Sequence, residues 1–558
     1  MKADAAGADN GSTWADAFTD LQSALDVAGA GDEIWVAAGR YVPSRSYFPN
    51  PRCVAFALLP DVALYGGFAG VETSRDASDP RAFKTFLDGD LLGNDTAISG
   101  RSENAVHVLV ALTPVGPATV LDGFVVRGGH ATDSSVPGPL AGAGLFVVGG
   151  SPTIARCAFV ANACARDGDL GGAAATFAGG SPLVTLCDFR GNRCVGVAPN
   201  GSSGGVVERS RFRKNVTSGV VLADATRGLV DDCRFSENRA TTGGGVRVVR
   251  SRDCRVRRSR FTSLHATGGG GVALESSSNC VISEGLFERC DATGGGAVSV
   301  ADSDDVAIVS CEMRRCSATT GSGVSAFLCD RLRIENVLLA DGTTAPPGSP
   351  ALRFFYCGDT RISNSTIARS NHGGLFVGEG SSVAVVNSIF WSNIDGDIDV
   401  DFDASLTVAR SHVSLGWPGE GNVSGDPLFV SPGLGDYRLD AGSPCLETGD
   451  DASLPDDIAD LDGDGDSVEP LPLDLDGLPR RVDANGDRRP PWTWARTRGR
   501  GHQVSRRLIN KRIARLRPTT ATTRCRENGS MWRTRSSATA SSGRQQRHRL
   551  AWPKEIDP

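Results

Sequence analysis

The sequence predicts an all-β protein folded as a solenoid, a parallel β-helix in which each coil of chain lies on the one before. Three observations support this fold class. A short phrase recurs between residues 157 and 393 at intervals of 23–30 residues, the spacing of a repeat architecture. Each interval holds a glycine cluster and short alternating apolar runs, which are typical of turns and strands. Glycine is abundant, with 69 residues, and no repeat has room for an amphipathic helix, which argues against helical repeats.

The repeated phrase is a small residue or Cys, any residue, a large apolar residue and, three places further on, often Asn. The clear copies are residues 157–162, 187–192, 210–215, 233–238 and 388–393. Fainter copies have their large residue at Phe261, Phe287, Met313, Leu338 and Ile367, and Phe124 is expected to begin the series one coil earlier. Stacked coils would place the large residues in an internal ladder with rungs about 4.8 Å apart.

Two further columns follow from the same alignment. Cysteines two places before the large residue would form a second internal ladder, at Cys157, Cys187, Cys233 and Cys311. The position eight before the large residue is Asp or Asn in five consecutive coils, and such side chains cap backbone N–H groups in turns. These residues are Asp253, Asn279, Asp305, Asp330 and Asp359.

Residues 1–48 are predicted to cap the first coil. Thr13, with Asp16 three places on, is typical of a helix start. Phe18, Leu21 and Leu25 then supply an apolar stripe, and Gly29 ends the predicted helix. Such a helix would cover the open edge of the first coil and block edge-to-edge pairing. Residues 34–36 are the first predicted strand.

The coils are predicted to occupy residues 49–415, with long loops before residue 141 and regular repeats after it. Residues 416–487 leave the repeat and are expected to form a C-terminal cap of short strands with an Asp-rich loop. From about residue 488 the chain is rich in Arg, Ser and Thr and shows almost no strand pattern. We expect residues 488–558 to be a disordered or frameshifted tail. The alternative is a basic arm that binds a polyanion.

The repeats, with their opening and closing segments, resemble those of a known superfamily. The opening comprises residues 11–22, 31–41 and 64–68, and the closing comprises residues 387–393, 426–429, 436–439 and 442–445. The pattern resembles the right-handed parallel β-helix proteins of the pectin-lyase-like superfamily, and more narrowly the large secreted bacterial β-helix proteins. The resemblance covers about residues 1–480 and implies a right-handed coil. It does not select an activity, because this superfamily hosts lyases, hydrolases and adhesins.

The net charge of −7 conceals two opposite parts. Residues 480–558 hold 21 Lys and Arg against 5 Asp and Glu, whereas residues 1–479 hold 37 against 60. An acidic body disfavours nucleic acid as a partner, and no apolar run reaches the ~20 residues of a membrane helix. Residues 1–7 lack the apolar core of a signal peptide. We nevertheless expect a secreted or cell-surface monomer whose N-terminus is truncated here; the alternative is a protein that stays inside the cell.

The chain contains 15 cysteines, and their columnar placement favours buried thiols over a disulfide framework. Two pairs in adjacent coils could instead form disulfides, Cys164 with Cys194 or Cys290 with Cys316.

An acid-rich loop near the C-terminal end of the predicted cap is the candidate metal site. Calcium prefers several carboxylate oxygens, and Asp alternating with Gly lets a short loop wrap an ion. The candidate ligands are Asp460, Asp462, Asp464, Asp466 and Glu469. Leu471 stands where an EF-hand would have its last acidic ligand, so a looser Ca²⁺ loop is expected, with a solvated acidic turn as the alternative.

The resemblance implies the kinds of catalytic residue to look for. Pectate lyases imply bound calcium and an Arg or Lys that removes the proton next to a uronate carboxylate, and polygalacturonases imply paired or triple Asp. Neither signature is found in this sequence. Acidic and basic residues do gather in two adjacent coils, where an acidic sugar could bind. They are Asp231, Asp232, Arg252, Arg255 and Arg257.

The sequence therefore predicts a secreted or surface β-helix protein that binds a polysaccharide or cell-envelope glycan, or serves in adhesion. The alternative is a polysaccharide lyase or glycoside hydrolase that acts on uronate-containing polysaccharide. A third reading is a purely structural scaffold.

Overall fold

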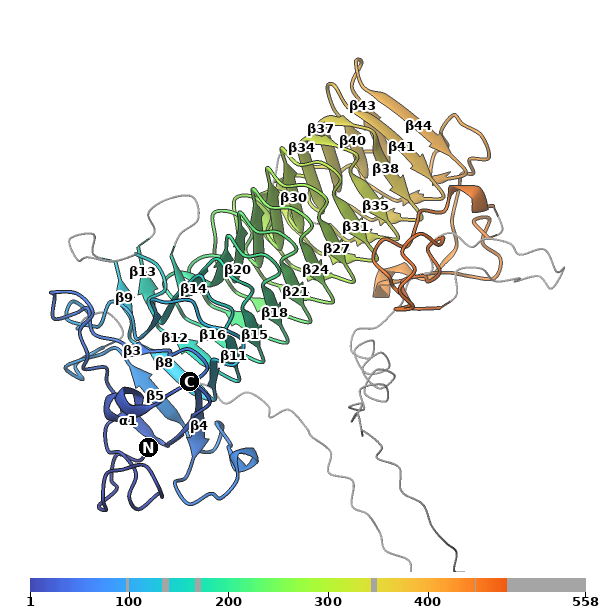
Figure 1. Ribbon diagram of the computed structural model, residues 1–558. Coiled ribbons are helices and arrows are strands. Elements are labelled where there is room, and N and C mark those ends of the chain that lie inside the picture. Colours follow the sequence, from blue (N-terminus) through green and yellow to red (C-terminus); the bar gives the residue numbers. More distant parts are fainter. Residues whose placement is uncertain (97–99, 133–139, 166–171, 343–348, 447, 479–558) are drawn as a thin grey trace, which may run out of the picture. The chain divides into compact units, whose positions relative to one another are not determined.

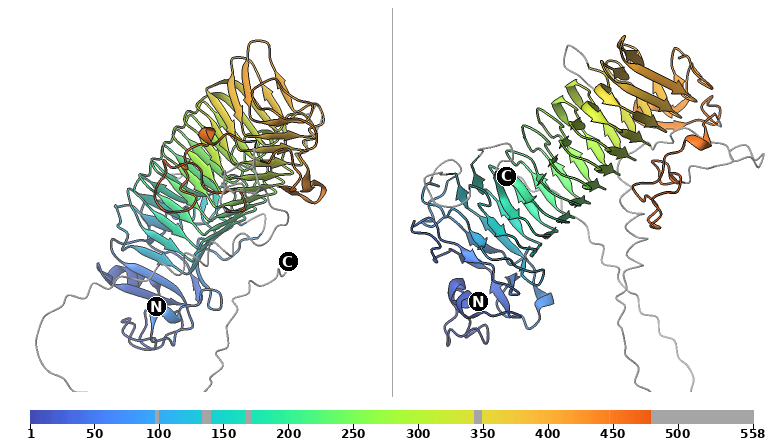
Figure 2. Two further views of the ribbon diagram at one scale, coloured as in Figure 1. Left: turned by 90° about the vertical axis from the view of Figure 1, so that its right-hand side faces the viewer. Right: turned by 45° about the horizontal axis from the view of Figure 1, so that its top comes forward.

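The computed structural model describes residues 1–96, 100–132, 140–165, 172–342, 349–446 and 448–478. It confirms an all-β, right-handed parallel solenoid, in which each coil contributes one strand to each of three parallel sheets (Figure 1). Two further views show the coils stacked one on another along the whole series (Figure 2). Along the chain, each coil passes from sheet 1 to sheet 2, then to sheet 3, and then begins the next coil.

Sheets 1 and 2 have fourteen strands each. The strands of sheet 1 are β1 (Glu33–Ala37), β4 (Ala63–Phe68), β7 (Val120–Asp122), β11 (Thr153–Ala155), β15 (Leu183–Thr185), β18 (Val206–Glu208), β21 (Leu229–Asp231), β24 (Arg255–Arg257), β27 (Val281–Ser283), β31 (Ala307–Val309), β35 (Arg333–Glu335), β38 (Thr360–Ser363), β41 (Ser382–Val386) and β44 (Ser405–Ala409). The strands of sheet 2 are β2 (Gly39–Tyr41), β5 (Thr85–Asp88), β8 (Phe124–Arg127), β12 (Ala158–Val160), β16 (Asp188–Arg190), β19 (Arg211–Arg213), β22 (Arg234–Ser236), β25 (Arg260–Thr262), β28 (Leu286–Glu288), β32 (Glu312–Arg314), β36 (Leu338–Ala340), β39 (Thr366–Ala368), β42 (Ile389–Trp391) and β45 (His412–Val413).

Sheet 3 has thirteen strands, and three small two-stranded sheets complete the β structure. The strands of sheet 3 are β3 (Phe56–Ala57), β6 (Leu109–Ala111), β10 (Leu145–Val148), β14 (Ala173–Ala178), β17 (Val195–Asn200), β20 (Val220–Ala223), β23 (Val246–Val249), β26 (Val272–Glu275), β30 (Val298–Ala301), β34 (Val324–Asp330), β37 (Leu352–Gly358), β40 (Leu375–Val377) and β43 (Ile398–Val400). The small sheets pair β9 (His130–Ala131) with β13 (Ala163–Cys164), β29 (Asp291–Gly294) with β33 (Ser317–Thr320), and β46 (Phe429–Ser431) with β47 (Asp436–Leu439).

Helix is scarce in the described residues: one α-helix, α1 (Leu21–Val27), and three 3₁₀ turns, η1 (Arg75–Ala77), η2 (Pro432–Leu434) and η3 (Asp451–Ser453). The predicted helix start was wrong. Asp20 is the N-cap and accepts from the Ser23 amide, whereas Thr13 and Asp16 bond each other in a preceding turn. The apolar face of α1 is buried in the main core. No helix in these ranges is long and apolar enough to cross a membrane.

The predicted ladder of large side chains lies inside the solenoid against sheet 2. Five aromatic pairs from Phe159 to Phe287 stack with ring centroids 4.5–5.0 Å apart, because parallel in-register strands place each ring over the next. Glycine makes room for these rings. A Cβ on Gly245, for example, would lie 2.5 Å from Cδ1 of Phe261.

Two members of that ladder were assigned wrongly from the sequence. Met313 pairs with Leu339 rather than Leu338, and Phe159 pairs with Val126 rather than Phe124. In both places two apolar side chains compete for the column, and both are buried. Leu338 faces outward, where Phe429 and Tyr437 of the C-terminal segment cover it.

Polar ladders stand beside the aromatic one. Asn192 accepts from both the backbone N and the side-chain Nδ2 of Asn162, and donates to the carbonyl of Phe159. The buried side-chain amide of Asn192 thus pairs with backbone groups of the turn in the preceding coil. The same contacts recur at the next rungs, Asn215 and Asn238. The predicted cysteine column is also internal, with serine oxygens from the next coil accepting backbone amides, as Ser210 does for Cys187.

The turn column differs from its prediction in one member and in its bonding. Asp253, Asn279, Asp305 and Asp359 all have φ between 46° and 57°, a region that Asx tolerates. Because of the slip at Leu339, the fifth member is Arg331 and not Asp330. The side chains join neighbouring rungs rather than capping backbone amides: Asn279 donates to Asp253 at 2.6 Å, and Arg331 pairs with Asp305 at 2.6 Å.

All fourteen cysteines in the described ranges are buried, and none of them is in a disulfide. Cys164 and Cys194 lie side by side as thiols, as do Cys290 and Cys316, so neither pair is a disulfide here. Burial raises the pKa of Cys157 to about 12, which keeps such a thiol protonated and unreactive.

The C-terminal segment folds back over the solenoid. Arg314 donates to the carbonyl of Gly435, Tyr437 donates to Asp341, and Arg361 donates to the carbonyl of Ser453. These contacts cover the outer faces of sheet 1 around β35 and of sheet 2 around β36. The predicted tail, residues 488–558, lies outside the described residues.

Candidate functional site: the arginine face of sheet 2

Basic residues concentrate in a few central coils. Residues 187–260 contain 16 Arg and Lys against 7 Asp and Glu, whereas residues 1–479 as a whole contain 37 against 60. The solenoid therefore carries a basic band within an acidic body. A charge count over whole domains hides this band, and a count over single coils reveals it.

Strand geometry brings part of this charge onto one surface. In β16, β19, β22 and β25 the middle residue is the inward Phe, so both flanking residues point outward. Arg211 pairs in register with Arg234, and Arg234 with Arg260, which makes a column with one arginine per coil. We call this outer surface over β16–β25 the arginine face.

Arg190 and Arg213, which pair in register, form a second column beside the first. Asp188 lies 3.8 Å from Nε of Arg190 and 3.5 Å from Nη2 of Arg213. Asp188 therefore moderates the charge of the arginine face at the end nearer the N-terminus.

The arginines repel one another. Burial lowers the pKa of Arg211, and the neighbouring Arg234 lowers it further, while Asp188 raises it and Arg213 and Arg81 lower it. Like charges directly opposite in a sheet are destabilising. The arginines of this column therefore lie close enough to influence one another's charge.

The face changes character toward the N-terminus. Arg40 and Arg127 both bind the buried carboxylate of Asp88, at 2.6 and 2.7 Å, and Arg127 also lies over the ring of Phe86. These two arginines are therefore neutralised within the protein. Ala158 and Val160 of β12 separate them from the arginine face.

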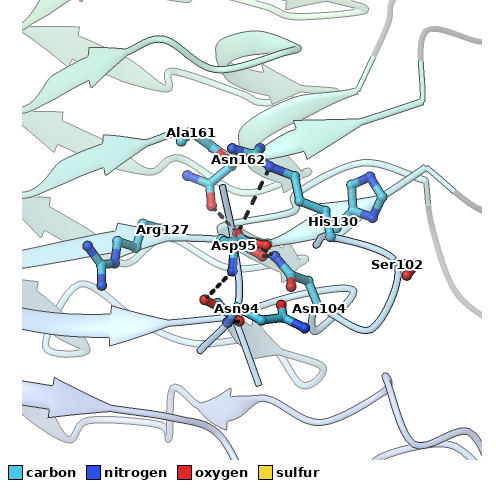
Figure 3. A network of polar contacts seen from close by, with 12 residues as sticks. Asn94, Asp95, Ser102, Asn104, Arg127, His130, Ala161 and Asn162 are labelled. Carbon is cyan, nitrogen blue, oxygen red and sulfur yellow. Dashed lines mark hydrogen bonds and ion pairs between the residues drawn. The ribbon is translucent and has the colours of Figure 1, made fainter. Parts of the chain in front are cut away.

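A polar network lies behind this region, and the sequence analysis did not find it. Asp90 accepts the backbone amides of Gly93 and Asp95, at 2.7 and 3.1 Å, and so shapes the loop after β5. Asp95 accepts from Nδ2 of Asn104 at 3.0 Å, and burial raises its pKa. Figure 3 shows Asp95 and Asn104 at the centre of these contacts, with Arg127 set apart from them. Because Asp90, Asp95 and Asn104 are buried or half-buried and are bonded in sequence, the network is structural.

Three of the five predicted catalytic residues lie together. Asp231 is only 5 % exposed, and it accepts from Nη2 of Arg257 at 3.2 Å and Nε of Arg258 at 2.8 Å. The next residue, Asp232, keeps exposed surface, yet partial loss of solvent around its carboxyl group and then the charge of Asp231 raise its pKa. This cluster borders the arginine face.

The other two predicted residues do not join that cluster. Arg255 is exposed at the start of β24. Arg252 lies in the turn between sheets 3 and 1, in a column with Thr226 and Ser278. Arg211, Arg234 and Arg260 were not predicted, although alignment by coil places all three in one column.

The predicted metal loop also divides. Two groups have carboxylate oxygens within 4.8 Å of one another, Asp457 with Asp462 and Glu469, and Asp460 with Asp462 and Asp464. Asp466 belongs to neither group; its amide donates to Asp464. Asp457 precedes the Asp-Gly motif and was not predicted.

Comparisons with known proteins agree with the fold. The family model described as "Right handed beta helix region" matches residues 122–261 and 230–413, which together exceed half of the chain. No curated protein matches the sequence significantly.

Several solved structures resemble the solenoid at low identity. The periplasmic alginate epimerase AlgG has 10% identity and a TM-score of 0.35, over 68% of this chain and 84% of the epimerase. The A-module of a mannuronan C-5 epimerase from Azotobacter vinelandii has 14% identity and a TM-score of 0.36, over 73% and 94%. A pectate lyase has 11% identity and a TM-score of 0.30, over 81% and 91%.

Proposed function

Since the chain belongs to the right-handed β-helix family, we propose that the arginine face uses the repeat of this fold to bind an acidic polysaccharide. The polymer would lie across β16, β19, β22 and β25 and present carboxylate groups to Arg211, Arg234 and Arg260. We place this contact outside the cell or at its surface, in adhesion or in attachment to an envelope glycan.

The observation that carries the proposal is the in-register arginine column. Its three guanidinium groups repeat at about the 4.8 Å strand spacing. A guanidinium offers two parallel N–H donors that match a carboxylate, and such charge-assisted hydrogen bonds are the stronger class. A linear polymer with regularly placed carboxylates is therefore the complementary ligand.

The surroundings favour an acidic glycan over other polymers. Outside residues 187–260, residues 1–479 contain 21 Lys and Arg against 53 Asp and Glu, so a long nucleic acid would be repelled beyond the band. The outward residues of β16–β25 are Asp, Arg, Ser and Thr. The strands of this face thus offer charge and hydroxyl groups rather than aromatic surface to a ligand.

The test is binding of fluorescently labelled polygalacturonate and alginate oligomers, measured by polarisation at two salt concentrations, with dextran and single-stranded DNA alongside. The Arg211→Ala/Arg234→Ala variant should bind the acidic glycans at least about tenfold more weakly, since each charge-assisted bond contributes about 1.5–3 kcal/mol. The matched control is Arg227→Ala/Arg252→Ala, which removes the same charge from the opposite corner of the same coils.

Equal losses in both variants would mean that net charge, and not the column, drives binding. Preference for DNA would overturn the glycan proposal. Ultraviolet absorbance of the glycan samples, followed over hours, would reveal the unsaturated product of a lyase and so reassign the face to catalysis.

A further inference from the structure

The C-terminal segment holds a group of carboxylates that face one another without a cationic side chain in its own sequence. Residues 450–479 contain no Lys or Arg. Asp457, Asp462 and Glu469 place carboxylate oxygens within 4.8 Å of one another, and Asp462 is shared with a second group that contains Asp460 and Asp464. Such a set repels itself unless a cation joins it.

A buried, unsatisfied oxygen points to a ligand at this group. Asp457 has no exposed surface, and its Oδ2 accepts from the Leu461 amide at 2.7 Å. Its Oδ1 is buried and has no hydrogen-bond partner in the described residues, and the same is true of Oε1 of Glu469. Buried carboxylate oxygens are normally paired with donors or metals. Both unsatisfied atoms belong to residues of the first carboxylate group.

The backbone holds the group in a fixed frame. The Asp457 amide donates to the carbonyl of Glu469 at 2.8 Å, and the Leu471 amide donates to the carbonyl of Pro455 at 2.8 Å. These bonds close residues 457–469 into a loop whose two ends lie side by side. Gly463 and Gly465, with φ of 76° and 93°, turn the chain within this loop, where Asp462 lies beside Asp457 and Glu469 at the two ends.

This loop is attached to the solenoid. Ala459 and Leu471 pack against Ala307 and Val309 on the outer face of β31. Asn336 also donates to the carbonyl of Leu473. An ion bound by these carboxylates would therefore link the two ends of the loop. It would also hold Ala459 and Leu471 against sheet 1.

We propose that Ca²⁺ binds Asp457, Asp462 and Glu469, with Asp460 and Asp464 completing the oxygen shell, and that the ion fastens the C-terminal segment to sheet 1. Calcium takes six to eight oxygen ligands in flexible geometry, which suits a loop with this many carboxylates. Burial and then the neighbouring carboxylates raise the pKa values of Asp457 and Glu469, and a cation among these oxygens would favour their ionised forms. Asp466, which the sequence suggested, is not a ligand in this proposal.

The first measurement is calorimetric titration of the full chain with CaCl₂ after treatment with EDTA. We expect one saturable site in the wild type. Asp457→Asn should bind at least tenfold more weakly, and Glu469→Gln provides a second variant in case the first does not fold. Asp466→Asn removes one charge from the same loop and should bind as the wild type does.

The second measurement is hydrogen exchange of the segment that covers residues 454–474, with and without Ca²⁺. Added Ca²⁺ should slow exchange in this segment in the wild type and in Asp466→Asn, and have no effect in Asp457→Asn. Absence of saturable binding, or equal loss in Asp466→Asn and Asp457→Asn, would overturn the site. Binding without slower exchange would overturn the fastening role. None of these outcomes depends on the arginine face.

Discussion

A single ring shows how the solenoid is stabilised at the scale of the residue. Phe235 is buried between Phe212 and Phe261, with ring centroids 5.0 and 4.9 Å away. Each ring thus packs against the rings of the coils before and after it. Its loss would leave a cavity between those two coils. The aromatic column is repeated core packing in one dimension.

Phe235→Ala should lower the free energy of unfolding by about 3–5 kcal/mol, the usual cost of removing a buried aromatic side chain. Urea unfolding followed by circular dichroism measures the loss. The control is Phe402→Ala, because Phe402 is fully exposed. Equal effects of the two substitutions would contradict the ladder as a source of stability.

A buried histidine makes stability depend on pH. Burial lowers the pKa of His107 to about 4, and its Nδ1 lies 3.0 Å from the carbonyl of Gly142, to which it donates when the ring is neutral. In the unfolded chain the pKa returns to about 6.5. Between these values the unfolded chain binds a proton that the folded one does not, so stability falls as the pH falls from 6.5 toward 4.

Wild type and His107→Gln should therefore respond differently to acid. Between pH 7 and pH 5 the wild type should lose about 2 kcal/mol more than the variant in urea unfolding, since each pKa unit corresponds to about 1.36 kcal/mol. Parallel pH profiles of the two proteins would show that His107 is not the group responsible.

At the scale of the element, the glycine turns before strands of sheet 3 pack against side chains of sheet 2 across the coil. Gly245 immediately precedes β23 of sheet 3, yet the atoms nearest a Cβ at that position belong to Phe261 of sheet 2, in the next coil. The glycine clusters therefore do more than form turns. They let the chain approach the aromatic column from the opposite side.

Gly245→Ala should destabilise the protein by about 1–3 kcal/mol, the range for overpacking a core. The comparison is Gly433→Ala, because a Cβ there would meet no atom within 4 Å. A thermal melt of each variant measures the difference. Similar melting temperatures for the two would show that the coil absorbs the extra methyl group.

Periodicity predicted the strands, the three ladders and the fold class, since each depends on residues one coil apart. It could not choose between Leu338 and Leu339, because both are apolar and burial of Leu338 comes from a segment about a hundred residues later. It found Asp231 and Arg257, which pair across adjacent coils, but not the column of Arg211, Arg234 and Arg260, which needs the register of three strands. Asp457 was missed because no spacing links it to the Asp-Gly motif.

At the scale of the whole solenoid, charge and cover divide the outer surface of sheet 2 into two parts. The C-terminal segment covers sheet 2 around β36, with Phe429 and Tyr437 over Leu338. The arginine face lies on the same sheet several strands earlier, at β16–β25. One sheet therefore has a basic part and a covered apolar part, and both follow from which outward residues each coil supplies.

The 26-residue step that joins Phe235, Phe261, Phe287 and Met313 has a consequence for how such a gene changes. Duplicating or deleting one 26-residue repeat leaves each strand paired with an equivalent strand. It adds or removes one residue from every ladder at once. Evolution can thus alter the molecule in whole coils without solving the packing problem again. The number of repeats in the gene therefore sets how many charged residues stand in a row on one surface.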